Sequence, residues 1–138
     1  MDYAHISWHK NCIPIGMGEY SKRFGNLGES IASAYLKDNG YRVLDSNFRS
    51  NQGEIDIIAE EGDVLVFVEV KNYSYRSYGM PLGAVRKGKR ESIIHAAKTY
   101  LYKNRIRDKN CRFDVVSLYW ESMSQRKVEL IKDAFRLC

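Results

Sequence analysis

Hydrophobic and polar residues alternate in two runs within GEIDIIAEEGDVLVFVEVK, residues 53–71. A period of two residues is typical of β-strands, and the Gly-containing break at residues 61–63 predicts a turn between the runs. We therefore expect strands over 53–60 and 64–72, joined as an antiparallel hairpin.

Two other stretches have helical periodicity. A helix is expected over 28–39, where Ile31 and Tyr35 share one stripe and Asn39-Gly40 is a stop signal. A second helix is expected over 86–104. Its buried side should carry Ile93, Ala97, Tyr100 and Leu101.

Further alternating runs predict strands over 41–49, 112–120 and 127–135. The resulting order is helix, three strands, helix, strand, strand. This order predicts an α/β fold in which a mixed β-sheet is flanked by helices. Residues 1–22 have weak periodicity and are interpreted as an N-terminal extension, which leaves 23–138 as the domain.

Composition narrows the class of protein. The 138 residues, 44% hydrophobic and 28% charged, fit one globular domain. No apolar run approaches the ~20 residues of a membrane-spanning helix, and the first residues lack the features of a signal peptide, so we expect a cytoplasmic protein without membrane contact. The cysteines are odd in number and form no CxxC pair, which argues against a disulfide framework and a structural zinc site.

Positive charge is concentrated between Arg86 and Arg112. This block holds ten Lys or Arg and two acidic residues, in a chain whose net charge is +5. Such a block is typical of a protein that binds phosphate backbones, and equally of a solvated helix followed by a charged loop. Charge alone leaves both interpretations open.

Three charged residues interrupt the predicted hairpin. Because side chains alternate across a strand, Glu69 and Lys71 share one face of the second strand. Asp56 lies in the first strand, on the face opposite Ile55 and Ile57, and the hairpin brings it to the same end as Glu69. We therefore expect two carboxylates and an ammonium group to converge.

Charges on a sheet face beneath a helix are costly to desolvate, so something must compensate them. One interpretation is a structural network of Asp56, Glu69 and Lys71 at a wet sheet edge. The other is a bound divalent cation, since Mg²⁺ prefers a few carboxylate oxygens together with waters and phosphate. Lys71 would then contact the attacking water or the phosphate.

Asp56, followed thirteen residues later by Glu69-Val70-Lys71, resembles the D…(D/E)xK signature of the PD-(D/E)XK nuclease superfamily. The chain resembles one branch of this superfamily more closely, the YraN-type bacterial proteins of uncharacterised function. The matching segments are LGESIASAYLKDNGYRVLDSNFR, GEIDIIA, VFVEVK, YGMPLGAV, AAKTYL and RFDVV, within roughly residues 23–137. The resemblance implies a restriction-endonuclease-like core of αβββαβ order, close to that of archaeal Holliday-junction resolvases.

Carried over position by position, the resemblance implies that Asp56 and Glu69 bind Mg²⁺ or Mn²⁺ together with the backbone carbonyl of Val70. Lys71 would position or activate the attacking water. Glu29 matches the acidic residue that completes such sites, although a glutamate in the first turn of a helix is also favoured by the helix dipole. The implied function is a metal-dependent endonuclease acting on DNA, including branched or junction DNA.

Position 73 departs from the family pattern, because Tyr73 stands where we expect an arginine, and Arg76 is the nearest substitute. The expected partner is nucleic acid, DNA in particular. Its contacts are expected from Arg76, Arg86, Lys87, Lys89, Arg90 and Arg112.

Resolvase relatives act as symmetric dimers, so a homodimer is a further candidate, although no residue of the sequence identifies its interface. Two alternative functions remain open. One is a nucleic-acid-binding protein that keeps the fold without significant catalysis. The other is an interaction protein whose charged cluster is structural.

Overall fold

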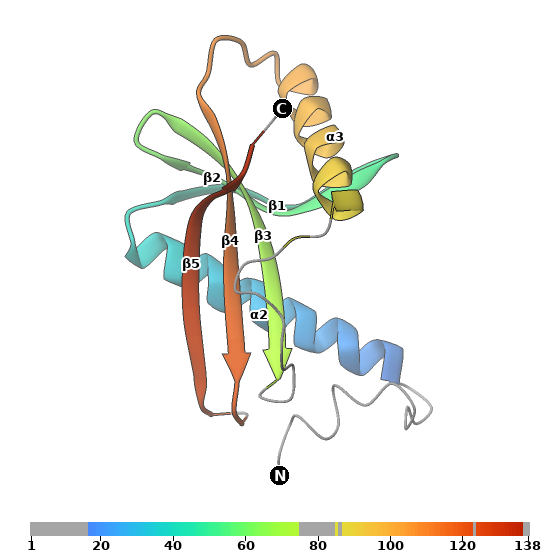
Figure 1. Ribbon diagram of the computed structural model, residues 1–138, viewed down its shortest axis with the longest axis vertical. Coiled ribbons are helices and arrows are strands. Elements are labelled where there is room, and N and C mark those ends of the chain that lie inside the picture. Colours follow the sequence, from blue (N-terminus) through green and yellow to red (C-terminus); the bar gives the residue numbers. More distant parts are fainter. Residues whose placement is uncertain (1–16, 75–84, 86, 123, 137–138) are drawn as a thin grey trace.

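The described residues form one mixed sheet with a helix on each face (Figure 1). The computed structural model describes residues 17–74, 85, 87–122 and 124–136. The helices are α2 (Met17–Asp38) and α3 (Lys87–Lys103). The strands are β1 (Arg42–Ser50), β2 (Gly53–Glu61), β3 (Val64–Ser74), β4 (Cys111–Trp120) and β5 (Arg126–Phe135). The α/β class and the element order expected from the sequence are confirmed, and the arrangement is compatible with a restriction-endonuclease-like core.

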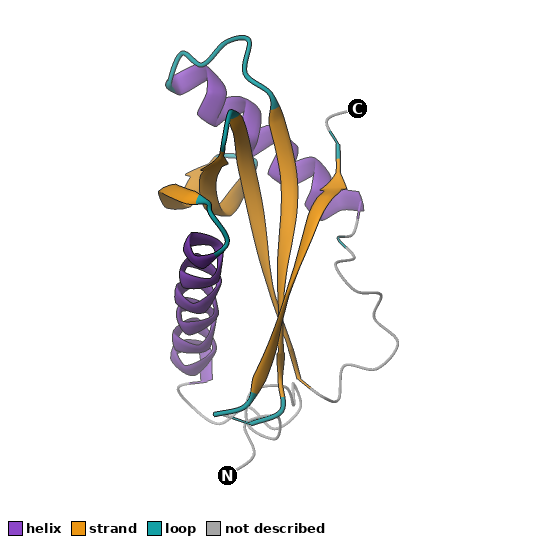
Figure 2. Ribbon diagram, turned by 90° about the vertical axis from the view of Figure 1, so that its left-hand side faces the viewer, coloured by secondary structure: helices purple, strands orange, loops and turns teal. Residues whose placement is uncertain are grey.

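The strands lie in the spatial order β1-β2-β3-β4-β5, so each neighbours the next along the chain. All pairs are antiparallel except β3 with β4, which are parallel. Parallel neighbours need a crossover connection, and α3 lies in it. Figure 2 shows the result, with α2 and α3 on opposite sides of the sheet.

Each helix buries its apolar side against its own face of the sheet. The α2 side of the core consists of Ala32, Leu36, Tyr41, Ile57, Ala59, Val66, Val68, Val116, Leu118 and Trp120. The α3 side consists of Ile55, Ile58, Leu65, Phe67, Ile93, Ala96, Ala97, Tyr100, Phe113 and Phe135. The buried side predicted for the second helix is therefore confirmed. None of the helices in the described part of the chain combines the length and apolarity needed to cross a bilayer.

Helix α2 is longer than the helix expected over 28–39, because it begins at Met17. It continues across the boundary that the sequence suggested between residues 22 and 23. Its end was predicted correctly: Gly40 has a φ of 87°, which glycine adopts without a Cβ clash. Glu29 consequently lies in the interior of the helix. The helix dipole, which acts within the first turn, does not account for this residue.

The alternation of side chains along β2 breaks at Asp56. Ile57 packs toward α2, but Ile55 packs with Ile58 on the α3 side, so the face assigned to Ile55 from the sequence was wrong. Asn47, the residue opposite Asp56 in β1, has a φ of 55°. Non-glycine residues rarely adopt this left-handed conformation, and asparagine is among those that tolerate it best. The change of face coincides with the point at which the β2–β3 pairing ends.

Candidate active site

Strand β2 separates from β3 at Asp56. The β2–β3 pairing ends at Ile57 and Val68, whereas β3 continues beside β4. Beyond that point a side-chain hydrogen bond replaces the backbone pairing of the two strands. Oδ2 of Asp56 accepts a hydrogen bond of 2.8 Å from the backbone N–H of Val70. This bond fixes the Asp56 carboxylate beside the end of the β2–β3 pairing.

Glu69 is the buried carboxyl group of this region. Its side chain is 6% exposed, and its Oε2 has no hydrogen-bond partner among the described residues. Its Oε1 lies 3.7 Å from Nζ of Lys89, in the first turn of α3. Burial raises the pKa of Glu69 to about 8, and Asp56 adds to the effect, whereas Lys89 and Lys71 oppose it. A buried oxygen without a partner is costly unless a proton or a cation compensates it.

The carboxyl groups of Asp56 and Glu69 influence each other. The pKa of Asp56 is also raised by burial, but the N–H of Val70 and the Glu69 side chain oppose the rise. The two groups are close enough to perturb each other's proton binding, and a side-chain hydrogen bond between them lowers the pKa of Asp56 and raises that of Glu69. Glu69 is the member of the pair that binds a proton more tightly, because the N–H of Val70 stabilises the charged form of Asp56.

Glu29 approaches the pair from α2. The preceding residue, Gly28, allows this helix to pack closely on β3, since a Cβ there would lie 2.6 Å from the Asn72 side chain. Burial raises the pKa of Glu29, the charge of Asp56 raises it further, and a hydrogen bond with Asn47 lowers it. Glu29 therefore lies at the margin of the same acidic cluster. It also lines an open groove of about 470 Å³ between α2 and β1.

Lys71 lies two residues beyond Glu69 and on the same face of β3. Its charge acts on Glu69, whose pKa it lowers. The side chain is partly buried, and the pairing of β3 with β4 places it opposite Ser117. The structure thus brings Asp56, Glu69 and Lys71 into one neighbourhood, with Glu29 at its edge.

The carboxyl pair fits a divalent cation of the Mg²⁺ type. No group of three or more His, Cys, Asp or Glu in the described ranges is placed to hold a metal by itself. Mg²⁺, however, commonly binds through one or two carboxylates and completes its shell with waters and substrate phosphate. The unpartnered Oε2 of Glu69 is the acceptor that such an ion requires. The ligand role of the Val70 carbonyl stays a prediction.

The basic residues expected near the site have different surroundings. Lys87 and Arg90 are exposed on the first turn of α3. Lys89 is directed at the buried carboxyl group of Glu69 instead. Arg76 and Arg86, which were also expected to contact nucleic acid, lie outside the described residues.

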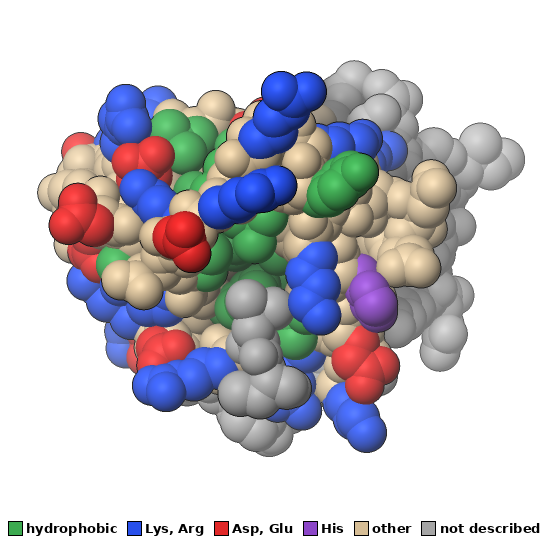
Figure 3. Space-filling view, turned by 90° about the horizontal axis from the view of Figure 1, so that it is seen from above, with side chains coloured by type: hydrophobic (Ala, Val, Ile, Leu, Met, Phe, Trp, Pro, Cys, Tyr) green, Lys and Arg blue, Asp and Glu red, His purple; other side chains and the backbone are tan. Residues whose placement is uncertain are grey.

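The second half of the basic block lies at the other end of α3. Lys103, Arg105 and Arg107 line an open groove of about 720 Å³. Figure 3 views the molecule from above, the end where this helix finishes, and shows Lys and Arg side chains spread over the surface. A helix of 17 residues is about 25 Å long. The block therefore does not form one continuous patch around the carboxyl pair.

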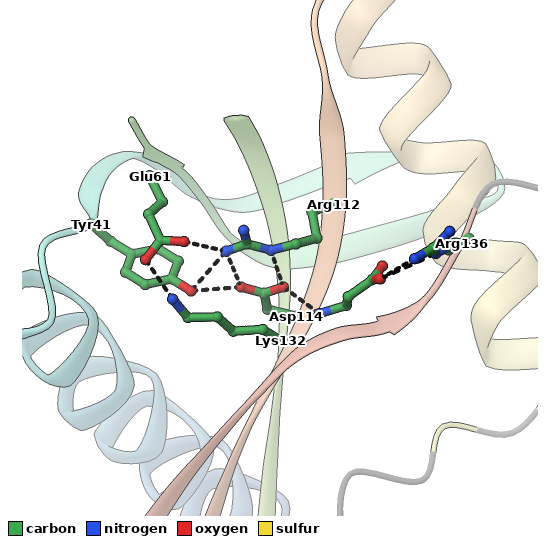
Figure 4. Close-up of polar contacts among 7 residues, drawn as sticks. Tyr41, Glu61, Arg112, Asp114, Lys132 and Arg136 are labelled. Atoms are coloured by element: carbon green, nitrogen blue, oxygen red, sulfur yellow. Dashed lines mark hydrogen bonds and ion pairs between the residues drawn. The ribbon is translucent and has the colours of Figure 1, made fainter. Parts of the chain in front are cut away.

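Arg112 belongs to a separate polar network at the start of β4 (Figure 4). Its guanidinium donates hydrogen bonds of 2.8 and 2.9 Å to Asp114, 2.7 Å to Glu61 and 2.9 Å to the Tyr41 hydroxyl. Asp114 is completely buried and also accepts a bond of 2.7 Å from Tyr41. Arg112 is thus the counter-ion of a buried carboxylate, and we leave it out of the proposed nucleic-acid surface. The only sequence signal of this network was an aspartate inside the apolar run RFDVV.

Tyr73 takes the position at which the family pattern leads us to expect an arginine. Its side chain is buried, and its ring stacks on that of Tyr119 with centroids 5.3 Å apart. A stacked pair on two parallel strands stabilises the sheet through packing. The position therefore contributes to the core, and it supplies no positive charge to the site.

Comparison with known proteins agrees with the resemblance found in the sequence. The sequence model of the Uncharacterised protein family UPF0102 matches residues 28–118. A UPF0102 protein of Syntrophus aciditrophicus is 48% identical over 115 residues, which cover 83% of this chain and 90% of that protein. UPF0102 proteins of Acetivibrio thermocellus and Clostridium tetani are 44% and 40% identical, over 88% of this chain and 97% and 100% of their own lengths. The chain therefore belongs to the UPF0102 family, as its YraN-type resemblance predicted.

Proposed function

We propose that the protein is a metal-dependent endonuclease that hydrolyses phosphodiester bonds of DNA, with branched or junction DNA among its substrates. The carrying observation is the juxtaposition of the buried Asp56 and Glu69 carboxyl groups where β2 leaves β3, with Lys71 beside them. Two carboxyl groups buried side by side repel each other when both are charged, so one of them binds a proton unless a cation is present. A site that exchanges this proton for a cation explains why the two acids lie together.

Each residue of the pair has a distinct part in this proposal. Asp56, held by the N–H of Val70, and Glu69 would bind Mg²⁺ or Mn²⁺. When bound, such a cation stabilises negative charge developing on the phosphate and lowers the pKa of a coordinated water. Lys71 holds the attacking water in line with the bond that breaks. The water oxygen bonds to phosphorus, the bond to the leaving sugar oxygen breaks, and the proton lost by the water is balanced by one that the leaving oxygen gains from solvent.

The first turn of α3 supports binding of a phosphate backbone near the pair. It contains no acidic residue, and Lys87 and Arg90 are exposed there. The N-terminal end of a helix also carries the positive end of its dipole. Lysine and arginine contacts with phosphates make affinity fall as salt rises, whatever the base sequence.

A second candidate is a nucleic-acid-binding protein that keeps the fold without cleavage. Lys89 favours this alternative, because its ammonium group already lies 3.7 Å from Glu69 and competes with a cation. Such a protein would bind DNA in a salt-dependent manner and leave it intact.

The deciding experiment is a cleavage panel of duplex, flap, single-stranded and four-way-junction DNA, with Mg²⁺, with Mn²⁺ and with chelator. We expect metal-dependent cleavage of at least one substrate by the wild type. Asp56→Asn and Lys71→Met should each reduce it by roughly 100-fold or more. Matched controls are Asp63→Asn in the β2–β3 turn and Lys98→Met on α3, both at exposed positions. Salt-sensitive binding without cleavage of any substrate would favour the second candidate.

A further inference from the structure

Two open grooves meet at Lys103, in the last turn of α3 and remote from the carboxyl pair. In the groove of about 720 Å³, Tyr102, Arg105 and Arg107 surround an apolar floor of Leu101 and Ile106. The other groove, of about 490 Å³, lies between α3 and the β1–β2 turn. Arg49, Thr99, Lys103 and residues 50–52 line it. Neither lining contains an acidic side chain, so both grooves present positive charge and hydrogen-bond donors.

The positive charges of these grooves are accessible to an anionic ligand. Among the described residues, Lys103, Arg105 and Arg107 take part in no ion pair, and all three are exposed. Arg49 has an acidic neighbour, Glu54, at 3.5 Å, but both side chains are largely exposed. An exposed pair of this kind is weak, so a phosphate group competes with it readily.

Tyr102 is the most exposed large apolar side chain in the described part of the chain. Its side chain is 86% exposed, whereas Leu27 and Leu44, the next two, reach only 37% and 39%. Figure 3 faces this end of the molecule and shows Lys and Arg side chains around apolar ones. An accessible aromatic ring among cationic side chains is the arrangement that binds single-stranded nucleic acid, because bases stack on the ring while the cations contact phosphates.

Arg105 occupies a backbone position that favours glycine. Its φ is 53°, and α3 ends in a Schellman-type cap, in which Ile106 N–H donates to the Leu101 carbonyl and Arg105 N–H to the Tyr102 carbonyl. A side chain in this left-handed conformation costs free energy that glycine avoids. An exposed arginine gains little from packing to offset the cost, so its presence points to a ligand contact.

We propose that the α3-end surface binds an unpaired stretch of DNA. This surface consists of Arg49, Tyr102, Lys103, Arg105 and Arg107. The Tyr102 ring stacks on one base, and the four cationic side chains contact the neighbouring phosphates. Bases within a duplex are already stacked on each other, so an aromatic ring finds its partner in a strand without pairing.

The location of the surface makes a branched DNA the fitting substrate. Helix α3 has 17 residues and is about 25 Å long, the length of roughly seven base pairs. A duplex arm along α3 would reach the carboxyl pair while the unpaired strand is held at the other end. This consequence rests on the proposed function. Binding of the single strand does not require cleavage.

The first test measures binding of a fluorescent oligothymidylate to the full chain by anisotropy, with chelator so that no strand is cut. Tyr102→Ala should weaken binding roughly fivefold or more, whereas Tyr102→Phe should retain it, because the ring alone stacks. Tyr35→Ala, at a partly exposed position on the opposite face of the sheet, is the matched control and should bind like the wild type. Wild-type binding by Tyr102→Ala overturns the stacking role.

An abasic strand of the same length separates stacking from charge, since it keeps the phosphates and lacks the bases. The wild type should bind it more weakly than oligothymidylate, and Tyr102→Ala should cause no further loss. An equal loss from Tyr102→Ala on both strands would contradict stacking on a base.

The arginines are tested by salt dependence and stability together. Arg107→Ala should weaken binding to both strands and make the log–log salt slope shallower by about 0.7. Lys127→Ala, at an exposed position of β5, should change neither. Arg105→Gly should weaken binding in the same way and also raise the free energy of unfolding, because glycine suits the left-handed position. Unchanged binding in both arginine variants overturns the proposal.

These outcomes are independent of catalysis. If the wild type cleaves DNA and all the variants bind oligothymidylate equally, the proposal fails and the proposed function stands. If the variants lose single-strand binding as expected and the wild type cleaves nothing, the surface is confirmed and the nuclease is not. A loss of blunt-duplex binding as large as the loss for the single strand would refute the preference for unpaired DNA.

Discussion

The ammonium group of Lys89 lies 3.7 Å from Oε1 of Glu69 and joins the first turn of α3 to the buried carboxyl pair. Among the described residues, Lys89 is the only Lys or Arg within 4 Å of this carboxyl group, whose pKa burial raises to about 8. The charge of Lys89 therefore favours the ionised forms of Asp56 and Glu69. A divalent ion bound by Glu69 would displace it and free its charge for a phosphate group.

Replacing Lys89 by methionine should raise the pKa of Glu69 further, because the attraction of Lys89 is the largest of the effects that lower it. The expected shift is on the order of half a unit to one unit, since the lysine is partly exposed to solvent. Titration of the Glu69 side-chain carbon by NMR measures it. Lys87→Met, two residues earlier and at an exposed position, is the matched control and should change little. Equal shifts of the Glu69 pKa in both variants would show that Lys89 has no specific contact with Glu69.

Glu69→Gln should flatten the pH dependence of stability in the metal-free protein. The folded pKa of about 8 lies above the ordinary value of 4.5, so the folded state binds the proton more tightly. The stabilisation from this group is fully present below pH 4.5 and is lost as pH rises through about 8. The wild type should lose on the order of 1 kcal/mol per pH unit within this window.

The glutamine variant should therefore exceed the wild type in stability at pH 9, and the difference should shrink toward pH 5. Urea unfolding in the presence of chelator measures both proteins across this range. Glu121→Gln, at an exposed position after β4, should follow the wild-type curve. If the free energy of unfolding of the wild type rose between pH 5 and 8 relative to that of Glu69→Gln, the raised pKa of Glu69 would be refuted.

Arg112→Met should destabilise the fold by about 3 kcal/mol or more, because it leaves the completely buried Asp114 without its counter-ion. The two remaining bonds to this carboxylate, from the Tyr41 hydroxyl and the backbone N–H of Asp133, are weaker compensation for a charge. Arg42→Met removes the exposed 3.0 Å ion pair with Glu60 and should cost less than about 0.5 kcal/mol. Urea unfolding compares the two. Similar losses would mean that Arg112 is not structural.

Gly53→Ala should weaken the contact between the β1–β2 turn and α3. A Cβ at this position would lie 2.3 Å from the backbone oxygen of Ser92, and neither backbone can move without shifting the helix. The expected cost is about 1–3 kcal/mol, measured by thermal or urea unfolding. Gly88→Ala is the control, because a Cβ there meets nothing within 4 Å, and it should be neutral or slightly stabilising. A neutral Gly53→Ala would show that the turn and the helix do not pack this closely.

Local features of the sequence were sufficient to predict the hairpin that carries the candidate site. The period of two in β2 and β3, with Gly62 at a φ of 57° in the turn, depends only on neighbouring residues. The same holds for the end of α2 at Gly40 and for the placement of Glu69 and Lys71 on one face. For this reason the pairing of Asp56 with Glu69 could be anticipated, and the motif gave it a chemical meaning.

Other features depended on segments that approach one another from far apart in the chain. The sequence did not indicate that Lys89 would contact Glu69, that Arg112 would neutralise Asp114, or that Ser117 would lie opposite Lys71. Nor did the period of β2 predict the face of Ile55, which packs with Ile58 on the α3 side. By itself the sequence determined the order of the elements and the candidate carboxylates, because backbone periodicity is local. Only the tertiary structure decided which charges are buried, paired or left without a partner, because burial and pairing arise when distant segments pack together.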